Sequence, residues 1–228
     1  MYDEDGYLVE KTTPTETTNY TYNTLGALTH VETPTKTITY HLNALNQRVA
    51  KEVDGVIVEK YLWLNLTTLL AIYDGEDNLV QRFNYTDQRM PTSMTMDNET
   101  YYMHYNQVGS LRVVTNQDNE IVKEITYDTY GNILTDSNTD LHVPFGFAGG
   151  LHDRDTNLVH FGYREYDPYT GKWTAKDPIG FDGGDSNLYG YVLGDPVGFI
   201  DPTGEFGVAG AIAGGITGTV LSFYDPCT

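Results

Sequence analysis

The chain has 228 residues, and its 13 Lys and Arg against 32 Asp and Glu give a formal net charge of −19 at pH 7. That charge repels phosphate, so it excludes nucleic-acid binding through a basic face and disfavours attachment to anionic lipid. The 19 Tyr, 8 Phe and 2 Trp supply enough ring area for a core, so charge-driven disorder is not expected. The single cysteine, Cys227, rules out an internal disulfide framework and a multi-cysteine metal site.

The first ten residues contain no apolar run, so they do not form a signal peptide. We expect a start inside a longer repeat array, or an orphan copy of one. From there to about residue 140, Thr, Tyr, Val and Ile alternate with polar residues, as in 37–40 and 56–61, between turn residues such as Asp-Gly. This texture predicts antiparallel hairpins. The apolar run 62–72 is compatible with a helix or with a buried strand pair.

A seven-residue pattern, Tyr-[Asn/Asp]-x-x-Gly-x-[Leu/Ile], recurs through this region. It occupies residues 22–28, 105–111 and 127–133, with a degraded copy at 42–49. Neighbouring copies are 20 or 22 residues apart, which is enough for two strands and two turns, so each unit is predicted to be one hairpin. In each unit we expect the Tyr to pack, the Asn or Asp to bond its own backbone, and the Gly to adopt a positive φ.

These units resemble the YD repeats of Rhs proteins, Tc-toxin C components and teneurins. The resemblance implies an all-β fold, in which a strip of hairpins coils to form part of a hollow shell. It also implies two partners, the rest of such a shell and a C-terminal toxin. Ordinary hairpin repetition in an unrelated β protein is the alternative interpretation.

A second group of motifs follows the strip. It consists of Tyr-Asp-Pro-Tyr-Thr-Gly-Lys-Trp at 166–173, Asp-Pro-Ile-Gly at 177–180, Asn-Leu-Tyr-Gly-Tyr-Val at 187–192 and Asp-Pro-Thr-Gly at 201–204. This order resembles the Rhs-associated core. We therefore expect three parts: a YD-repeat strip at 1–143, the core at 144–205, and a Gly/Ala-rich remnant of a toxin junction at 206–228.

Each Asp-Pro-x-Gly sequence, including a third at 195–198, predicts a turn. In such a turn the Asp accepts hydrogen bonds from downstream N–H groups, Pro fixes φ, and Gly permits a left-handed conformation. The segment Tyr-Gly-Tyr-Val at 189–192 alternates and is predicted to be a strand.

The resemblance also implies an activity, because the Rhs core is similar to an intramolecular aspartic protease that cuts its own chain after the last of these turns. Carried over by position, the catalytic pair is Asp177 and Asp201, and the bond at risk is Glu205–Phe206. Three charged neighbours are auxiliary candidates: Lys176, Asp182 and Asp185. Two carboxyl groups within hydrogen-bond reach share a proton, so one can take a proton from water while the other acts as the acid.

The same motifs also allow a second interpretation, in which each Asp closes only its own turn and no bond is cut. Glu205 stands where the family usually has Leu. A negative charge beside the pair would raise the pKa of the pair and slow cleavage.

The tail, residues 206–223, is uncharged and has Gly210, Gly214 and Gly218 at every fourth position. This spacing is typical of a helix-packing face, so the tail is predicted to be a lead-in to a toxin domain or a helical hairpin. Its weak hydrophobicity and its lack of a basic flank argue against membrane insertion. Only 23 residues follow Glu205, too few for an ordinary toxin fold.

Neither a metal ion nor another cofactor is expected. Four residues that bind metals in other proteins cluster in sequence without meeting a ligand-spacing rule: His152, Asp153, Asp155 and His160. Residues 177–228 carry seven acids and no base, which solvated turns would explain.

Two non-enzymatic functions stay open. A Tyr- and Trp-rich acidic surface suits glycan or cell-surface binding, with Trp63 and Trp173 as stacking candidates. In the second of these functions, the chain is a purely structural fragment, and its exposed sheet edges are expected to drive association with other chains. Under the Rhs interpretation we expect a bacterial protein of interbacterial competition, cytoplasmic before export by a secretion apparatus and then secreted or delivered at the cell surface.

Overall fold

The structure is a computed structural model that describes residues 1–86, 89–205 and 212–213. Its elements in chain order are β1 (Glu10–Thr12), β2 (Thr17–Tyr22), β3 (Leu28–Glu32), β4 (Thr37–Leu42), β5 (Arg48–Val53), β6 (Val56–Trp63), β7 (Leu69–Tyr73), β8 (Leu79–Asn84), β9 (Ser93–Met96), β10 (Glu99–Tyr105), β11 (Leu111–Thr115), β12 (Ile121–Tyr127), β13 (Ile133–Asp136), η1 (Phe147–Gly149), β14 (Leu151–His152), β15 (Val159–Phe161), β16 (Arg164–Asp167), β17 (Lys172–Trp173), η2 (Gly180–Gly183), η3 (Val192–Gly194), β18 (Phe199–Ile200) and β19 (Ile212–Ala213).

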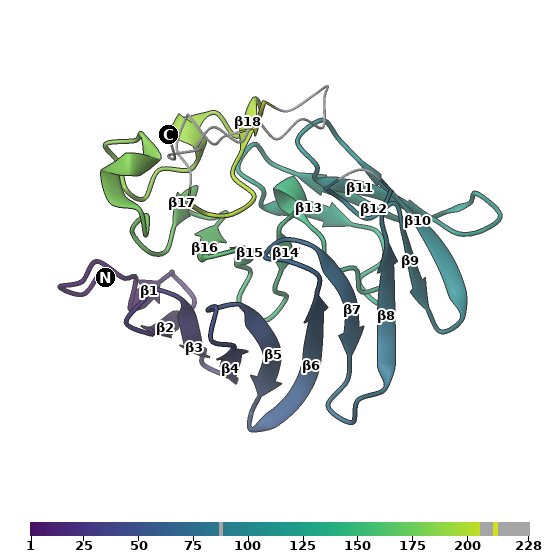
Figure 1. Ribbon diagram of the computed structural model, residues 1–228, viewed down its shortest axis with the longest axis horizontal. Coiled ribbons are helices and arrows are strands. Elements are labelled where there is room, and N and C mark those ends of the chain that lie inside the picture. The colour runs from purple at the N-terminus through teal and green to yellow at the C-terminus, as the bar shows by residue number, and fades with distance from the viewer. Residues whose placement is uncertain (87–88, 206–211, 214–228) are drawn as a thin grey trace, which may run out of the picture.

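Among these residues, β1 to β13 form one 13-stranded antiparallel sheet in which each strand pairs with its neighbours in the chain. Strands β14 to β17 form a 4-stranded sheet, and β18 pairs with β19. Figure 1 shows the large sheet following an arc, with the small sheet inside it. The all-β fold predicted from the hairpin texture is confirmed.

The repeat turns have the predicted local structure. The residue after each Tyr, at Asn23, Asn106 and Asp128, accepts hydrogen bonds from backbone N–H groups two and four positions downstream. The glycines of these turns have φ values of +81°, +83° and +94°, which side chains other than Gly rarely adopt. The apolar run 62–72 spans the end of β6, a turn and most of β7, so the strand pair is the right interpretation, although Leu62 and Leu64 are exposed and not buried.

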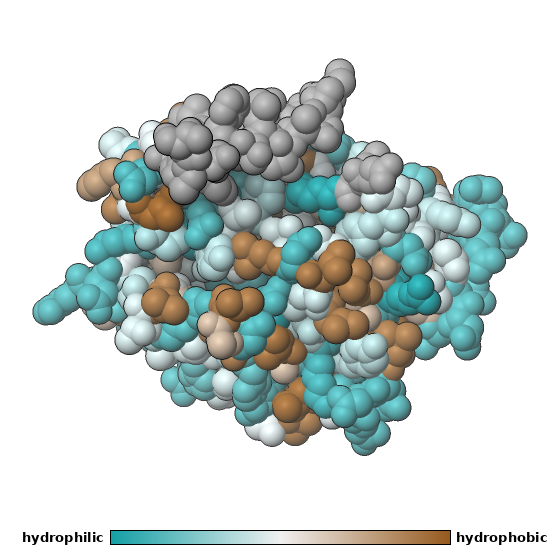
Figure 2. Space-filling model, viewed as in Figure 1, coloured by the Kyte–Doolittle hydropathy of each residue, from teal (hydrophilic) through white to brown (hydrophobic). Residues whose placement is uncertain are grey.

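Three apolar clusters connect the sheets, and one of them packs Leu158 against strands β2 to β4. Buried side chains of β7 to β12, such as Leu69 and Leu111, pack against Leu141, Val143 and Phe145 from the segment that follows the large sheet. A second cluster is largely aromatic, and Val108 joins it from the segment before β11; its largest members are Phe147, Phe161, Tyr166, Trp173 and Tyr191. On the surface, Figure 2 shows hydrophobic residues gathered across the middle of one face, with hydrophilic residues around them.

The strand predicted at 189–192 is wrong. Gly190 makes an isolated bridge with Lys172, and the chain then turns into η3. Val192 has a φ of +43°, so the backbone bends where an alternating strand would stay extended. The bend places the Tyr191 ring 4.5 Å from that of Tyr166, and the ring is 2% exposed, so burial of the aromatic side chain outweighs strand propensity.

Most of the tail lies outside the described residues, including Phe206 and Cys227. The exceptions are Ile212 and Ala213, in the segment for which a helix was expected, and they form strand β19. The described part of the chain contains no helix with the length and apolar character that a membrane crossing requires.

Candidate functional site

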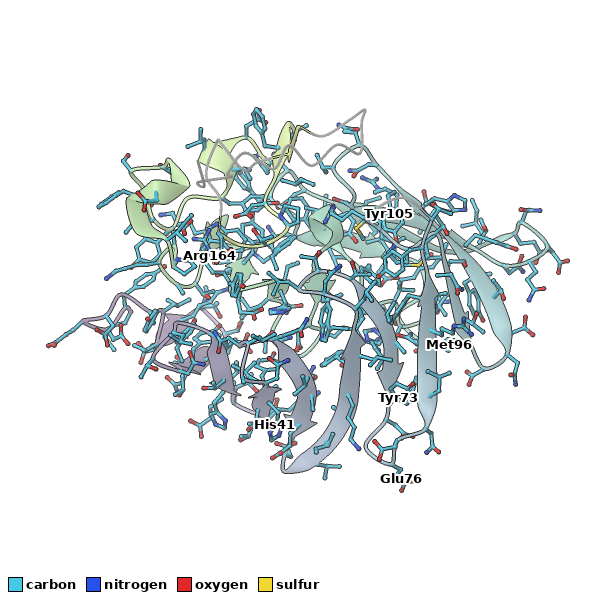
Figure 3. All side chains as sticks on the ribbon, in the orientation of Figure 1. His41, Tyr73, Glu76, Met96, Tyr105 and Arg164 are labelled. Carbon is cyan, nitrogen blue, oxygen red and sulfur yellow. The ribbon has the colours of Figure 1, made fainter. Side chains whose placement is uncertain are left out.

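A buried arginine organises the end of the core. Arg164 begins β16 and is 3% exposed. Its guanidinium carbon lies 4.2 Å from the centre of the Trp173 ring on β17, so the indole face orients it. Figure 3 labels Arg164 in the region where the small sheet meets the C-terminal loop. A cation buried in this way requires acidic partners.

Both predicted catalytic acids are those partners. The Nη2 atom of Arg164 donates to Oδ2 of Asp177 at 2.9 Å and to Oδ2 of Asp201 at 3.4 Å. Asp201 is fully buried and the Asp177 side chain is 9% exposed. Two carboxyl groups that are far apart in sequence therefore meet at one nitrogen atom.

Each acid also closes its own turn. Oδ1 of Asp177 accepts from the N–H of Ile179 at 3.0 Å, and Oδ1 of Asp201 accepts from the N–H of Gly204 at 2.9 Å. The predicted turn geometry is thus confirmed, and the turn is not the only contact of either acid, because one oxygen of each carboxylate serves the turn and the other faces Arg164. In the third such turn, Asp195 accepts from Gly198 at 2.9 Å and is exposed.

The backbone after Asp201 is held against the β15–β16 turn. Nε of Arg164 donates to the carbonyl oxygen of Gly204, and the N–H of Tyr163 donates to that of Thr203 at 2.9 Å. At Gly162, a Cβ atom would lie 2.4 Å from the carbonyl oxygen of Thr203. The two backbone segments can approach so closely only because this position has no side chain.

Three carboxyl groups share the field of one guanidinium. Burial raises the pKa of Asp177, although the charge and hydrogen bond of Arg164 oppose the shift. Burial, together with the negative charges of Asp177 and Asp201, raises the pKa of Glu205. The pKa values of Asp177 and Glu205 are therefore both displaced upward from those of isolated acids.

The auxiliary candidates lie elsewhere. Lys176 lies against the turn at Gly6, where a Cβ atom would come within 2.1 Å of its Cε atom. Asp182 is exposed in η2, and Asp185 accepts from the N–H of Asn187 at 2.8 Å to close its own turn. Phe206, on the far side of the bond at risk, lies outside the described residues.

Sequence reasoning overlooked Arg164, although one signal was available. Every Lys and Arg lies at or before Lys176, so an acid of residues 177–228 that becomes buried must find its cation upstream. Interpreting those acids as solvated turns is wrong for Asp201, which is fully buried.

A second ionic cluster joins the large sheet to the core and was also overlooked. Nζ of Lys51 on β5 donates to Asp153 at 2.9 Å and to Asp155 at 2.6 Å, and Tyr40 donates to Asp153 at 2.7 Å. Nearby, Arg48 pairs with Glu165 on β16 at 2.9 Å. The cluster borders a cavity of ≈ 450 Å³. Asp153 is therefore part of the ionic contact between the large sheet and the core. Within the described ranges, no group of three His, Cys, Asp or Glu side chains is placed to hold a metal ion.

Neither tryptophan proposed as a glycan-stacking residue is fully exposed. Trp173 is 1% exposed within the aromatic cluster, so the interpretation of its ring as a sugar platform is wrong. Trp63 is half-buried, and its indole N–H donates to the carbonyl oxygen of Arg48 at 2.7 Å.

Comparison with known proteins matches residues 1–191 to the family model described as Teneurin YD-shell. The chain is 28% identical to teneurin-3 of Danio rerio over 215 residues, which cover 90% of this chain and 8% of that protein. It is 28% identical to teneurin-1 of Homo sapiens over 220 residues, again 90% of this chain and 8% of the relative. The chain thus spans less than a tenth of the length of these relatives.

Two solved structures have a similar fold. A crystal structure of TcdB2-TccC3 matches with a TM-score of 0.65 and 20% identity, covering 82% of this chain and 10% of that one. A variant Tc holotoxin pore of Photorhabdus luminescens matches with a TM-score of 0.68 and 19% identity, covering 90% and 11%. At these identities the likeness concerns the fold alone. Because the family model covers most of its length, the chain belongs to the teneurin YD-shell family.

Proposed function

We propose that this chain is a segment of YD-repeat shell whose core cuts its own backbone beside Glu205, in a single turnover, as an aspartic protease. The observation that carries the proposal is the meeting of Asp177 and Asp201 at Nη2 of Arg164, a residue whose Nε atom holds the neighbouring carbonyl group of Gly204.

The chemistry follows from this arrangement. One carboxylate takes a proton from water, the water oxygen attacks the carbonyl carbon, and the protonated partner gives its proton to the leaving amide nitrogen. The bond is tethered to the acids, so no binding step limits the reaction. We propose the cut after Glu205, at Glu205–Phe206, the position that the resemblance to the Rhs core implies.

The partners belong to the same proposal. The similar structures include complexes of TcdB2 with TccC3, so we propose that the rest of a shell surrounds this segment and that the polypeptide after Glu205 is its cargo, a toxin. Delivery of that cargo requires export from a bacterial cytoplasm through a secretion apparatus. The teneurin relatives come from animals, so a cell-surface shell is the second candidate function.

Intact mass measurement of the purified chain at neutral pH tests the activity. We expect two fragments that meet beside Glu205, and Asp177→Asn and Asp201→Asn should each leave the chain whole. Asp195→Asn is the matched control, because it alters the same kind of turn outside the site and should leave cleavage unchanged. Neutral pH matters because Asp–Pro bonds break in acid without an enzyme. An intact wild-type chain would refute the activity and leave the shell role.

A further inference from the structure

We propose that Tyr189 is a positioning residue, which makes self-cleavage depend on the docking of residues 2–8 against the core. This inference rests on the proposed self-cleavage and adds a condition for it. The condition is a contact between Tyr189 and Gly6, which are 183 positions apart in the sequence. Neither of them belongs to the proposed pair of catalytic acids.

Residues 2–8 form a turn that packs on the core. Tyr2 and Leu8 make an antiparallel bridge across this turn, and Gly6 within it has a φ of +83°. The N–H of Leu8 donates to the carbonyl oxygen of Thr174, directly after β17, at 2.9 Å. Figure 1 shows β1 and the segment before it close to β17. The turn therefore brings this part of the strip against the core.

Tyr189 joins the turn to the loop between η2 and η3. Its hydroxyl donates to the carbonyl oxygen of Gly6 at 2.7 Å, and its ring lies edge-on to that of Tyr2, with 5.2 Å between the ring centres. The contact leaves no spare room, because a Cβ atom on Gly6 would lie 2.4 Å from the Tyr189 hydroxyl oxygen and 2.1 Å from Cε of Lys176. A displacement of the turn therefore displaces the side chains below it.

The loop that Tyr189 anchors holds two members of the catalytic site. The carbonyl oxygen of Leu188, the preceding residue, accepts from the N–H of Asp177 at 3.0 Å and from Nη1 of Arg164 at 3.2 Å. The carbonyl oxygen of Tyr189 accepts from the N–H of Trp173 at 3.1 Å, and the guanidinium of Arg164 lies over the ring of Trp173. Two consecutive carbonyl groups thus position the acid, the arginine and the ring that orients the arginine.

Lys176 gives the turn a second connection to the same acid, because it directly precedes Asp177 and its side chain lies against Gly6. The turn therefore contacts both backbone segments that meet in the hydrogen bond between Asp177 and Leu188. A misplacement of about 1 Å can slow a catalysed reaction roughly 100-fold. Self-cleavage consequently becomes efficient only when residues 2–8 are docked, after the strip has folded around the core.

Tyr189→Phe tests the contact from the side of the loop. It removes the hydroxyl that donates to Gly6 and keeps the ring, so we expect self-cleavage to slow roughly fivefold, the effect of losing one hydrogen bond. Tyr85→Phe is the matched control, because the Tyr85 hydroxyl also donates to a backbone carbonyl at 2.7 Å, that of Leu69 in the large sheet. This control should cleave at the wild-type rate. A Tyr189→Phe chain that also cleaves at the wild-type rate would overturn the inference.

Gly6→Ala tests the contact from the side of the turn. Its methyl group would displace Tyr189 and Lys176, so we expect self-cleavage to slow at least about tenfold. Gly55→Ala is the matched control for backbone strain, because Gly55 has a similar φ of +84° and a Cβ atom there would meet nothing within 4 Å. Equal slowing in the two variants would attribute the effect to strain and overturn the inference.

Amide hydrogen exchange, followed by NMR, tests the coupling whether or not the chain cuts itself. Tyr189→Phe should speed exchange of the Asp177 amide roughly fivefold, because the carbonyl group that holds it is loosened. The amide of Val114, buried in β11, should exchange at the wild-type rate. A merely structural role for Tyr189 would lower the stability of the whole chain and speed both amides, which would overturn the inference. Selective exchange in a chain that stays whole would support the positioning contact and refute the proposed activity.

Discussion

Asp177 and Asp201 are 24 positions apart in the sequence, yet their Oδ2 atoms accept hydrogen bonds from the same nitrogen, Nη2 of Arg164. Each acid keeps its other oxygen for its own Asp-Pro-x-Gly turn. The turns therefore orient the two carboxylates. Each turn fixes the backbone and one carboxylate oxygen, so the second oxygen faces Arg164. Turn formation and catalysis need not compete for the same residue.

Gly183 separates the Asp177 carboxylate from the backbone at Glu205. A Cβ atom at this position would lie 3.0 Å from Oδ2 of Asp177 and 3.5 Å from the carbonyl oxygen of Glu205. Gly183→Ala should therefore push the carboxylate aside and slow self-cleavage at least about tenfold, in line with the cost of small misplacements in catalytic sites. Time-resolved electrophoresis measures the rate.

The control for this prediction is Gly198→Ala. Its methyl group would approach the carboxylate of Asp195 at 2.5 Å, in an equivalent turn outside the site. Neither Gly183 nor Gly198 has a positive φ, so both should accept Ala without backbone strain. Equal rates for the two variants would show that the space at Gly183 has no part in the reaction.

Glu205 should set the pH range of self-cleavage. The reaction requires one protonated carboxyl group, so its rate falls as pH rises through the pKa of the pair, and burial raises the pKa of Asp177. Glu205 is coupled to both acids by charge. Glu205→Gln removes that negative charge, so the alkaline limb of the rate profile should move to lower pH, by roughly one unit or less. An unchanged or upward-shifted limb would contradict the coupling.

How far the sequence predicts this structure depends on the range of the interaction. Asn23 and Asp128 bond N–H groups within four residues, so the repeat turns were predictable from local chemistry alone. The strand expected at 189–192 failed because Tyr191 is buried by tertiary packing that no local pattern contains. The pairing of Asp177 with Asp201 was implied by family resemblance, whereas spacing alone could not have placed them together.

The ionic contacts show the same limit. Lys51 meets Asp153 across 102 positions, and Arg164 meets Asp201 across 37. Lys51 lies in β5 and Arg164 in β16, and the neighbouring residues of both strands have an ordinary β-strand pattern that does not indicate an ion pair. The charge balance indicates a long-range ion pair only at the end of the chain, where residues 177–228 contain acids but no base and Asp201 is buried. Which upstream base they meet depends on how the sheet curves.

Lys51 should contribute far more to stability than a surface lysine. Its side chain is 7% exposed and bonded to Asp153 and Asp155. Lys51→Met would leave Asp153 as a buried charge without its main partner, so we expect the free energy of unfolding to fall by about 3–5 kcal/mol. Lys60→Met removes a pair with Asp77, which is 79% exposed, and should cost no more than about 1 kcal/mol. Urea denaturation of both variants measures the difference, and similar losses would contradict the prediction.

Asp153 should also make stability depend on pH in acid. Burial opposes its ionisation, but Lys51 and then Arg48 outweigh burial and lower the pKa of Asp153 from 3.8 to about 2. A carboxyl group whose pKa is lower in the folded state stabilises the fold above its unfolded pKa, and this contribution is lost as pH falls from about 4 to about 2. The shift corresponds to roughly 2 kcal/mol. Asp153→Asn carries no titrating group, so in urea denaturation from pH 7 to pH 3 its stability should fall less steeply below pH 4 than that of the wild type. Parallel curves for the two proteins would mean that Asp153 is not held as an ionised partner of Lys51.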